Sequence, residues 1–131
     1  MKITINDVFE YEEKIIVSFY STVGAGFAKW ASSEKPSKNN SYDVELDIEK
    51  TVSEAWDKKN SYKPKSALMV DGTKVIVQGI LESIDEDGMA YLRISPDGLI
   101  MIEAGEGTFS EDENVILLLE YTDLKVTALG V

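Results

Sequence analysis

The sequence contains neither cysteine nor histidine among its 131 residues. Without cysteine the chain can form no disulfide and no thiolate metal site, which suits a reducing cytoplasm. Without histidine and cysteine it lacks the two commonest general bases and nucleophiles, so we predict that the protein is not an enzyme. Arg93 is the single arginine, which excludes an arginine-based phosphate clamp. We expect no cofactor and no metal ion.

Three patterns come close to a chemical site and fall short of one. Residues 24–29 read Gly-Ala-Gly-Phe-Ala-Lys, which resembles a phosphate-binding loop but lacks the Gly-Lys-Ser/Thr ending. An EF-hand register through Asp85 and Asp87 puts Ile94 where a bidentate glutamate is required. A pair of carboxylates suffices for glycoside hydrolysis, but the acids here fall mostly in turns and at alternating strand positions, where solvated carboxylates normally lie.

Long hydrophobic runs are also missing. The longest apolar run, residues 115–119, is far shorter than the roughly 20 residues that span a bilayer. The first seven residues alternate apolar and polar side chains, whereas a secretory signal needs an unbroken apolar stretch of about 7–15 residues. We therefore expect a soluble, cytoplasmic protein with no membrane partner.

Positive charge is scarce in the second half of the chain. The net charge is −11. Residues 1–70 carry ten lysines and eleven acids, whereas residues 71–131 carry three basic residues and thirteen acids. Such a surface repels nucleic acid and anionic membranes, and leaves a basic protein as the partner we expect. The alternative is that the acidity only keeps a small protein soluble.

Period-two alternation and turn signals dominate what is present, and they predict a mostly β fold in a single domain, residues 1–131. We expect a small OB-like or Greek-key barrel of about eight strands, with a two-sheet sandwich as the alternative. We expect one short helix at residues 51–59, a turn at residues 9–12 and a break in the strand pattern at the glycines of residues 24–26. Residues 30–41 predict an exposed, mobile loop. The strands are expected at residues 2–8, 13–23, 42–49, 74–84, 89–94, 99–103, 115–121 and 124–129.

The strand at residues 42–49 carries the sharpest candidate for a binding site. Alternation turns its apolar residues, Tyr42, Val44, Leu46 and Ile48, toward the core. Four carboxylates then form a row on the other face, about 7 Å apart and within a Debye length of one another. We interpret the row as a docking strip for a basic surface. The alternative is a solvated face balanced by Lys14, Lys50 or Lys125. The row consists of Asp43, Glu45, Asp47 and Glu49.

Two further features are candidate contacts with a partner. The hairpin turn at Asp85, Glu86 and Asp87 presents three acids next to Gly88, which accepts a positive φ. Its alternative role is ordinary turn solvation. Trp30 and Trp56 stand in segments expected to be irregular, where an exposed aromatic side chain makes a good interface anchor, although a loop tryptophan also often folds back over a small core.

Residues 42–56 and 72–131 resemble a group of small, acidic bacterial proteins. The similar elements are YDVELDI, Trp56, VQGILESIDEDGMAYLRI, LIMIEAGE and VILLLEYTDLKV. Such proteins are similar in size and composition to immunity proteins encoded beside polymorphic toxins. The resemblance implies a protein-binding role, here an immunity-type inhibitor that covers a basic toxin nuclease. The alternative is an OB-like accessory domain that binds a small ligand, a carbohydrate or the edge strand of another protein. The oligomeric state cannot be read from the sequence.

Overall fold

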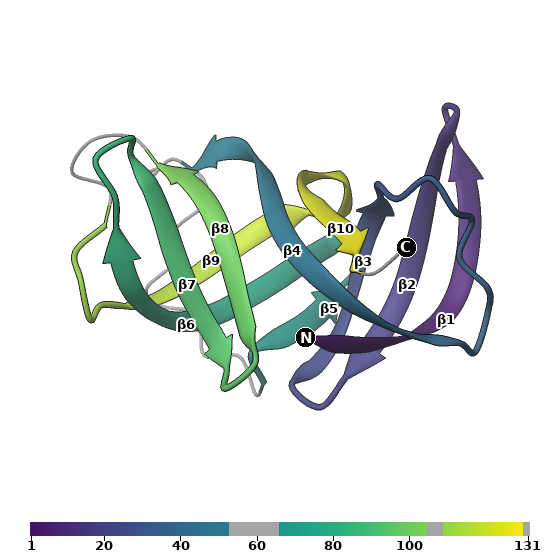
Figure 1. The fold of residues 1–131 in the computed structure, drawn as a ribbon, viewed down its shortest axis with the longest axis horizontal. Helices are drawn as coiled ribbons and strands as arrows, with labels where there is room; N and C mark the ends of the chain where they lie inside the picture. The colour runs from purple at the N-terminus through teal and green to yellow at the C-terminus, as the bar shows by residue number, and fades with distance from the viewer. Residues whose placement is uncertain (53–65, 105–108, 130–131) are drawn as a thin grey trace.

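The computed structural model describes residues 1–52, 66–104 and 109–129. Nearly all regular structure in these residues is β-strand, as the period-two alternation predicts (Figure 1). A single 3-10 turn, η1 (Tyr121–Asp123), joins the last two strands. The strands are β1 (Lys2–Tyr11), β2 (Lys14–Ser21), β3 (Gly24–Trp30), β4 (Ser41–Val52), β5 (Leu68–Asp71), β6 (Lys74–Ile84), β7 (Met89–Ser95), β8 (Gly98–Ala104), β9 (Asn114–Glu120) and β10 (Leu124–Ala128).

The strands close into a small barrel. Backbone pairing runs β1–β2–β3–β5–β6–β7–β8–β4 and returns from β4 to β1, which makes an eight-stranded ring. β10 lies between β3 and β4, and β9 pairs with β6. The β3–β5 closure has one aligned pair, Gly24 and Leu68. The prediction of a small, mostly β barrel with little helix is confirmed, with closure in place of a two-sheet sandwich.

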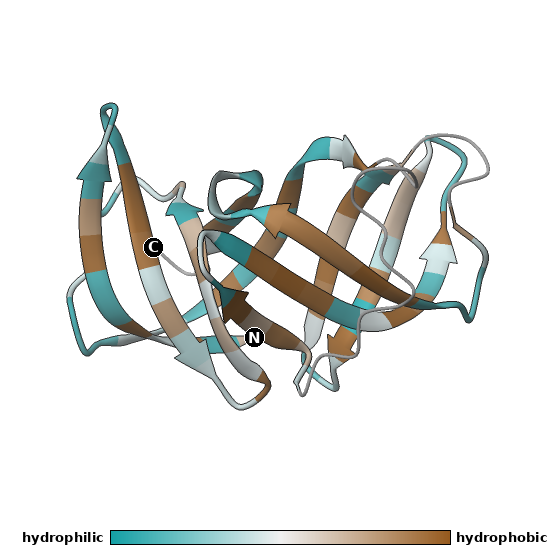
Figure 2. Cartoon of the chain, turned by 180° about the vertical axis from the view of Figure 1, so that it is seen from behind, coloured by the Kyte–Doolittle hydropathy of each residue, from teal (hydrophilic) through white to brown (hydrophobic). Residues whose placement is uncertain are grey.

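Alternation along each strand builds the core. In β4 the side chains of Val44, Leu46 and Ile48 are buried, and in β9 those of Val115 and Leu117 are completely buried. Figure 2 shows the result as brown stretches along the strands of the barrel, with teal at several turns. In β4 every second residue therefore belongs to the core, whereas parts of β2, β6 and β9 are buried on both faces.

Two strands were missed by the sequence prediction. Residues 24–26 do not break the pattern but begin β3, and the short strand β5 was not expected. Glycine is needed at this point for contact rather than for a break, because a Cβ on Gly24 would lie 1.8 Å from the backbone oxygen of Leu68. A Cβ on Gly26 would lie 2.8 Å from the ring of Phe19.

Local boundaries differ in three places. β1 continues through residues 9–11, and the hairpin turns at Glu12 and Glu13, whose φ angles are 50° and 65°. The predicted turn at 9–12 is therefore wrong in its bounds, and no Asn-Gly or Asp-Gly pair marks the true position in the sequence. Thr51 and Val52 continue β4 instead of starting a helix, and residues 53–59 lie outside the described residues. Residues 31–40 contain no strand, as expected, and two backbone hydrogen bonds join Ile5 to Asn39 and Asn40.

Candidate functional site

The four carboxylates predicted on one face of β4 are found there. Asp43, Glu45 and Glu49 are exposed, and the Asp47 side chain is 19% exposed. The apolar residues between them point into the barrel. We call this row, Asp43, Glu45, Asp47 and Glu49, the acidic strip.

Half of the acidic strip is neutralised by neighbouring strands. Lys125 of β10 places its Nζ 3.9 Å from Asp47 Oδ2 and 3.6 Å from Glu49 Oε1. Lys29 of β3 also pairs with Glu49. The hydrogen bond that Lys29 donates to Glu49 lowers the pKa of Glu49, and the charges of Lys29 and Lys125 lower it further. The balancing role expected of Lys125 is therefore correct, whereas Lys50 instead forms an ion pair with Asp123 at 3.2 Å.

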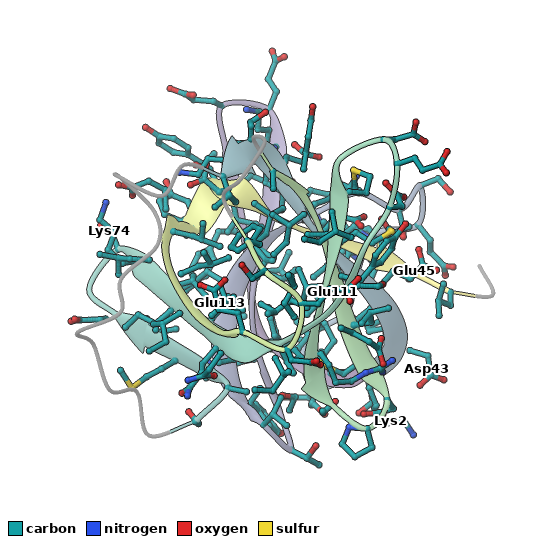
Figure 3. The ribbon with its side chains drawn as sticks, turned by 90° about the vertical axis from the view of Figure 1, so that its left-hand side faces the viewer. Lys2, Asp43, Glu45, Lys74, Glu111 and Glu113 are labelled. Atoms are coloured by element: carbon teal, nitrogen blue, oxygen red, sulfur yellow. The ribbon has the colours of Figure 1, made fainter. Side chains whose placement is uncertain are left out.

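The other half of the strip forms no ion pair with the described residues. Within the described part of the chain, neither Asp43 nor Glu45 has a cationic partner within ion-pair distance. Lys2 is aligned with Asp43 across the β1–β4 pairing, without an ion pair between them. Figure 3 shows Asp43 and Glu45 on one flank of the molecule, with Lys2 near Asp43 and Lys74 on the opposite side of the view. These two carboxylates are the part of the strip free to meet a cationic surface.

Asp47 is held in an unfavourable environment for a charge. Desolvation by burial raises its pKa, and the carboxylates of Glu45 and Glu49 raise it further, while Lys125 lowers it. Its Oδ1 is buried and has no hydrogen-bond partner among the residues that the structure describes. The ionised form of Asp47 therefore costs folding free energy at neutral pH.

Replacing Asp47 with Asn should raise the free energy of unfolding at pH 7, by about 0.5 kcal/mol or more. Because the folded pKa is raised, the wild-type protein loses stability as pH rises from the ordinary value of 3.8 through the raised pKa. Urea unfolding should therefore show the gain at pH 7 and its disappearance at pH 3, where both side chains are neutral. Glu49→Gln, on the same strand but with a lowered pKa, should change stability in the opposite direction at pH 7. A gain of equal size at both pH values would contradict the desolvation account.

The acidic hairpin tip between β6 and β7 is partly structural. Asp85 Oδ1 accepts hydrogen bonds from the backbone N–H groups of Asp87 and Met89, each at 3.0 Å. Its Oδ2 accepts one from the hydroxyl of Tyr91 at 3.0 Å, and this bond raises the pKa of Tyr91. Asp85 thus stabilises its own turn, while Glu86 and Asp87 are exposed at the tip.

Strand register places the acidic strip and this tip on one face. Met101 of β8 is aligned with Asp47 on one side and with Tyr91 on the other. Since aligned residues on neighbouring strands point to the same face, a continuous row crosses β4, β8 and β7 and ends at Asp85. We call the strip, this row and the tip the acidic face. Its continuity depends on the parallel β4–β8 pairing, which cannot be read from the sequence.

An apolar cavity opens within the acidic face. Its volume is about 240 Å³, and Glu45 and Asp97 are its acidic lining residues. The Ser95 hydroxyl donates a 2.8 Å hydrogen bond to Asp97, which lowers the pKa of that carboxyl and keeps it ionised. Asp97 lies in the turn between β7 and β8, and nothing local in the sequence links it to β4. Much of the rest of the lining is apolar or aromatic: Met1, Tyr91, Leu99, Met101 and Leu129.

Trp30 is not the exposed anchor that its sequence context suggested. It ends β3 with 7% exposure, because its ring packs into the core and makes an edge-on contact with Tyr42 at 5.1 Å. Its indole Nε1 donates a 2.7 Å hydrogen bond to the backbone oxygen of Glu34. Its role is therefore structural. Trp56 lies outside the described residues.

A further acidic segment, Glu111, Asp112 and Glu113, precedes β9. Glu111 and Glu113 are drawn near the centre of Figure 3, and Glu113 accepts a 2.9 Å hydrogen bond from the backbone N–H of Ser110. Among the described residues, no three acidic side chains are arranged to hold a metal ion. No helix in that same portion is long and apolar enough to cross a membrane.

Comparison with protein-family models, curated proteins and solved structures gives no match for this chain.

Proposed function

We propose that this chain is a protein-binding module without catalytic activity, an immunity-type inhibitor that covers a basic partner such as a toxin nuclease with its acidic face. The observation that supports this most is the placement of Glu45. It is a carboxylate without an ion pair in the described structure, on the acidic strip, and it also lines the apolar cavity.

That combination suits an arginine or lysine side chain from the partner. The aliphatic stem would lie on Leu99 and Met101, while the charged head would reach the carboxylates of Glu45 and Asp97. An apolar anchor inside a polar, charged rim is the usual composition of an interface hot spot. A cavity lined only by neutral side chains would contact the aliphatic stem but would leave the partner's charged head without a carboxylate to pair with.

The net charge of −11 favours a protein partner over nucleic acid. Phosphates would be repelled, whereas a basic nuclease carries a cationic groove of the opposite sign. Complementary charge also speeds association and makes it sensitive to salt. Binding by the acidic face should therefore weaken between 0.05 and 0.5 M salt, since the Debye length falls below about 10 Å above 0.1 M.

The test compares two double variants with the same change in charge. Asp43→Asn/Glu45→Gln removes both carboxylates without an ion pair from the strip, and Glu111→Gln/Asp112→Asn removes two acids from the loop before β9. The partner captured from the native cells is purified, and its affinity and any nuclease activity are measured with each protein. We expect the strip variant to bind about 10–100-fold more weakly at low salt and to lose inhibition, mostly through slower association. The loop variant should remain close to wild type.

Equal loss in both variants would mean that only total charge matters, and unchanged affinity in the strip variant would refute the proposal. Binding without inhibition would retain the protein-binding module and remove the inhibitor. The alternative, an accessory domain that binds a small ligand, carbohydrate or edge strand, is favoured in its small-ligand form by a separate aromatic groove beside the β1–β2 hairpin.

A further inference from the structure

An open groove lies between the outward side of the β1–β2 hairpin and the segment formed by the β5–β6 turn and η1. Its volume is about 380 Å³, within the range of small-molecule sites. The acidic face contributes none of its lining residues. Its lining includes four aromatic residues, Phe9, Tyr11, Phe27 and Tyr121, together with Glu10 and Ile16.

A local irregularity in β1 creates this groove. Ile3 and Ile5 point into the core, but the register of β1 against β2 shifts between Ile5 and Asp7. After this bulge Val8 packs against the core, so Phe9 is turned outward. Phe9 is aligned with Ile16 on β2, which is only 3% exposed although it faces the groove. Ile16 thus forms a covered apolar floor.

Two of the four rings stand out from the surface, whereas Phe27 and Tyr121 are partly buried and pack against the core. Phe9 is 45% exposed and Tyr11 54% exposed. Within the described structure, the one aromatic pair in ring contact is Trp30 with Tyr42, so the four groove rings do not stack on one another. Four aromatic side chains from three chain segments around an open volume can present their electron-rich faces to a ligand.

The charge beside the groove is mainly negative. Glu10 lines it, and Glu12 and Glu13 form the adjacent hairpin turn. The ion pair between Glu10 and Lys35, at 3.5 Å, is highly exposed and easily exchanged. Lys14, aligned with Tyr11, is the nearby cation on the same hairpin. Acids outnumber cations at this end, and aromatic faces attract cations.

We propose that this aromatic groove binds the alkylated ammonium group of a small organic cation, such as choline. The aromatic rings supply cation–π attraction, Glu10, Glu12 and Glu13 beside the groove supply the opposite charge, and Ile16 contacts the methyl groups. A ligand carrying a phosphate next to the ammonium group is disfavoured, because the phosphate would approach Glu10, Glu12 and Glu13.

The experiment is a titration of the intact protein followed by NMR, with choline and with 3,3-dimethylbutan-1-ol, which has the same shape without the charge. We expect choline to bind about fivefold or more tightly than the neutral compound and to shift resonances of Phe9, Tyr11 and Tyr121. Equal binding of both would overturn the proposal, because it would show an apolar groove only. Tighter binding of a trimethyllysine peptide than of choline would overturn the assignment to a small molecule.

Matched variants locate the site. Tyr11→Leu keeps an apolar side chain but removes the ring, and should weaken choline binding about fivefold. Tyr20→Leu is the control, because Tyr20 has nearly the same exposure, 53%, and does not line the groove. Glu10→Gln should weaken choline binding without a change in binding of the neutral compound. Equal effects of the two tyrosine variants would refute the site. A negative result for choline would not bear on the proposed role of the acidic face, since the two sites share no lining residue.

Discussion

Replacement of Gly24 with Ala is expected to lower the free energy of unfolding by about 3 kcal/mol or more. Two costs combine at this position. The φ angle of Gly24 is 127°, where an L side chain is strained, and the new Cβ would lie 1.8 Å from the backbone oxygen of Leu68. Backbone atoms cannot move aside as a flexible side chain can, so the β3–β5 closure must open or shift.

Gly72→Ala provides the matched control for this prediction. Gly72 also has a positive φ, 61°, but an added Cβ would meet nothing within 4 Å. Its cost should be about 1 kcal/mol, the conformational part alone. Urea unfolding of the two variants measures the difference. Equal losses of unfolding free energy in the two variants would show that the close approach of Gly24 to Leu68 adds no cost. They would contradict the β3–β5 pairing as the closure of the barrel.

The second large effect is expected at Phe19. Its side chain is 1% exposed in the core of β2, and Phe19→Ala should cost about 3–5 kcal/mol because it leaves a cavity. Tyr20→Ala, the neighbouring residue on the exposed side of the strand, should cost less than 1 kcal/mol. Thermal or urea unfolding would reveal the contrast.

Gly26 makes the Phe19 prediction more specific. The ring of Phe19 occupies the space where a Cβ on Gly26 would lie, at 2.8 Å. Gly26→Ala alone should therefore destabilise the wild type by about 1–3 kcal/mol, but should cost little in the Phe19→Ala background. Additive losses in the double variant would contradict direct contact between the two positions.

The fold was predictable from the sequence where the alternation of apolar and polar residues within a single strand identifies that strand. β4 alternates so regularly that its buried and exposed residues follow from the sequence, and the turns after β6 and β7 carry glycine. β3 was not predictable because its glycines are required by contacts that the local pattern does not show, those of Gly24 with the distant Leu68 and of Gly26 with the ring of Phe19 on the preceding strand. The four-residue strand β5 is too short for periodicity to show.

The candidate site was predictable residue by residue but not as a surface. Alternation places Asp43 and Glu45 outward, yet only the β10 pairing decides that Lys125 approaches Asp47 and Glu49 instead. The link from Asp47 through Met101 to Tyr91 depends on three strands in register. Non-local pairing of this kind leaves no local signal, and the same holds for the bulge that turns Phe9 outward. The resemblance to immunity proteins stays a prediction.

The position of β10 also has a consequence for folding during synthesis. β10 is the last strand in the sequence, and its Val126 is aligned with both Trp30 of β3 and Leu46 of β4. On the ribosome, β3 and β4 therefore emerge long before the strand that lies between them, and their backbone edges stay open to other nascent chains. Carboxylates at every second position of β4 repel an identical strand that approaches in parallel register. The acidic strip would then protect the unfinished barrel from aggregation before it meets any partner.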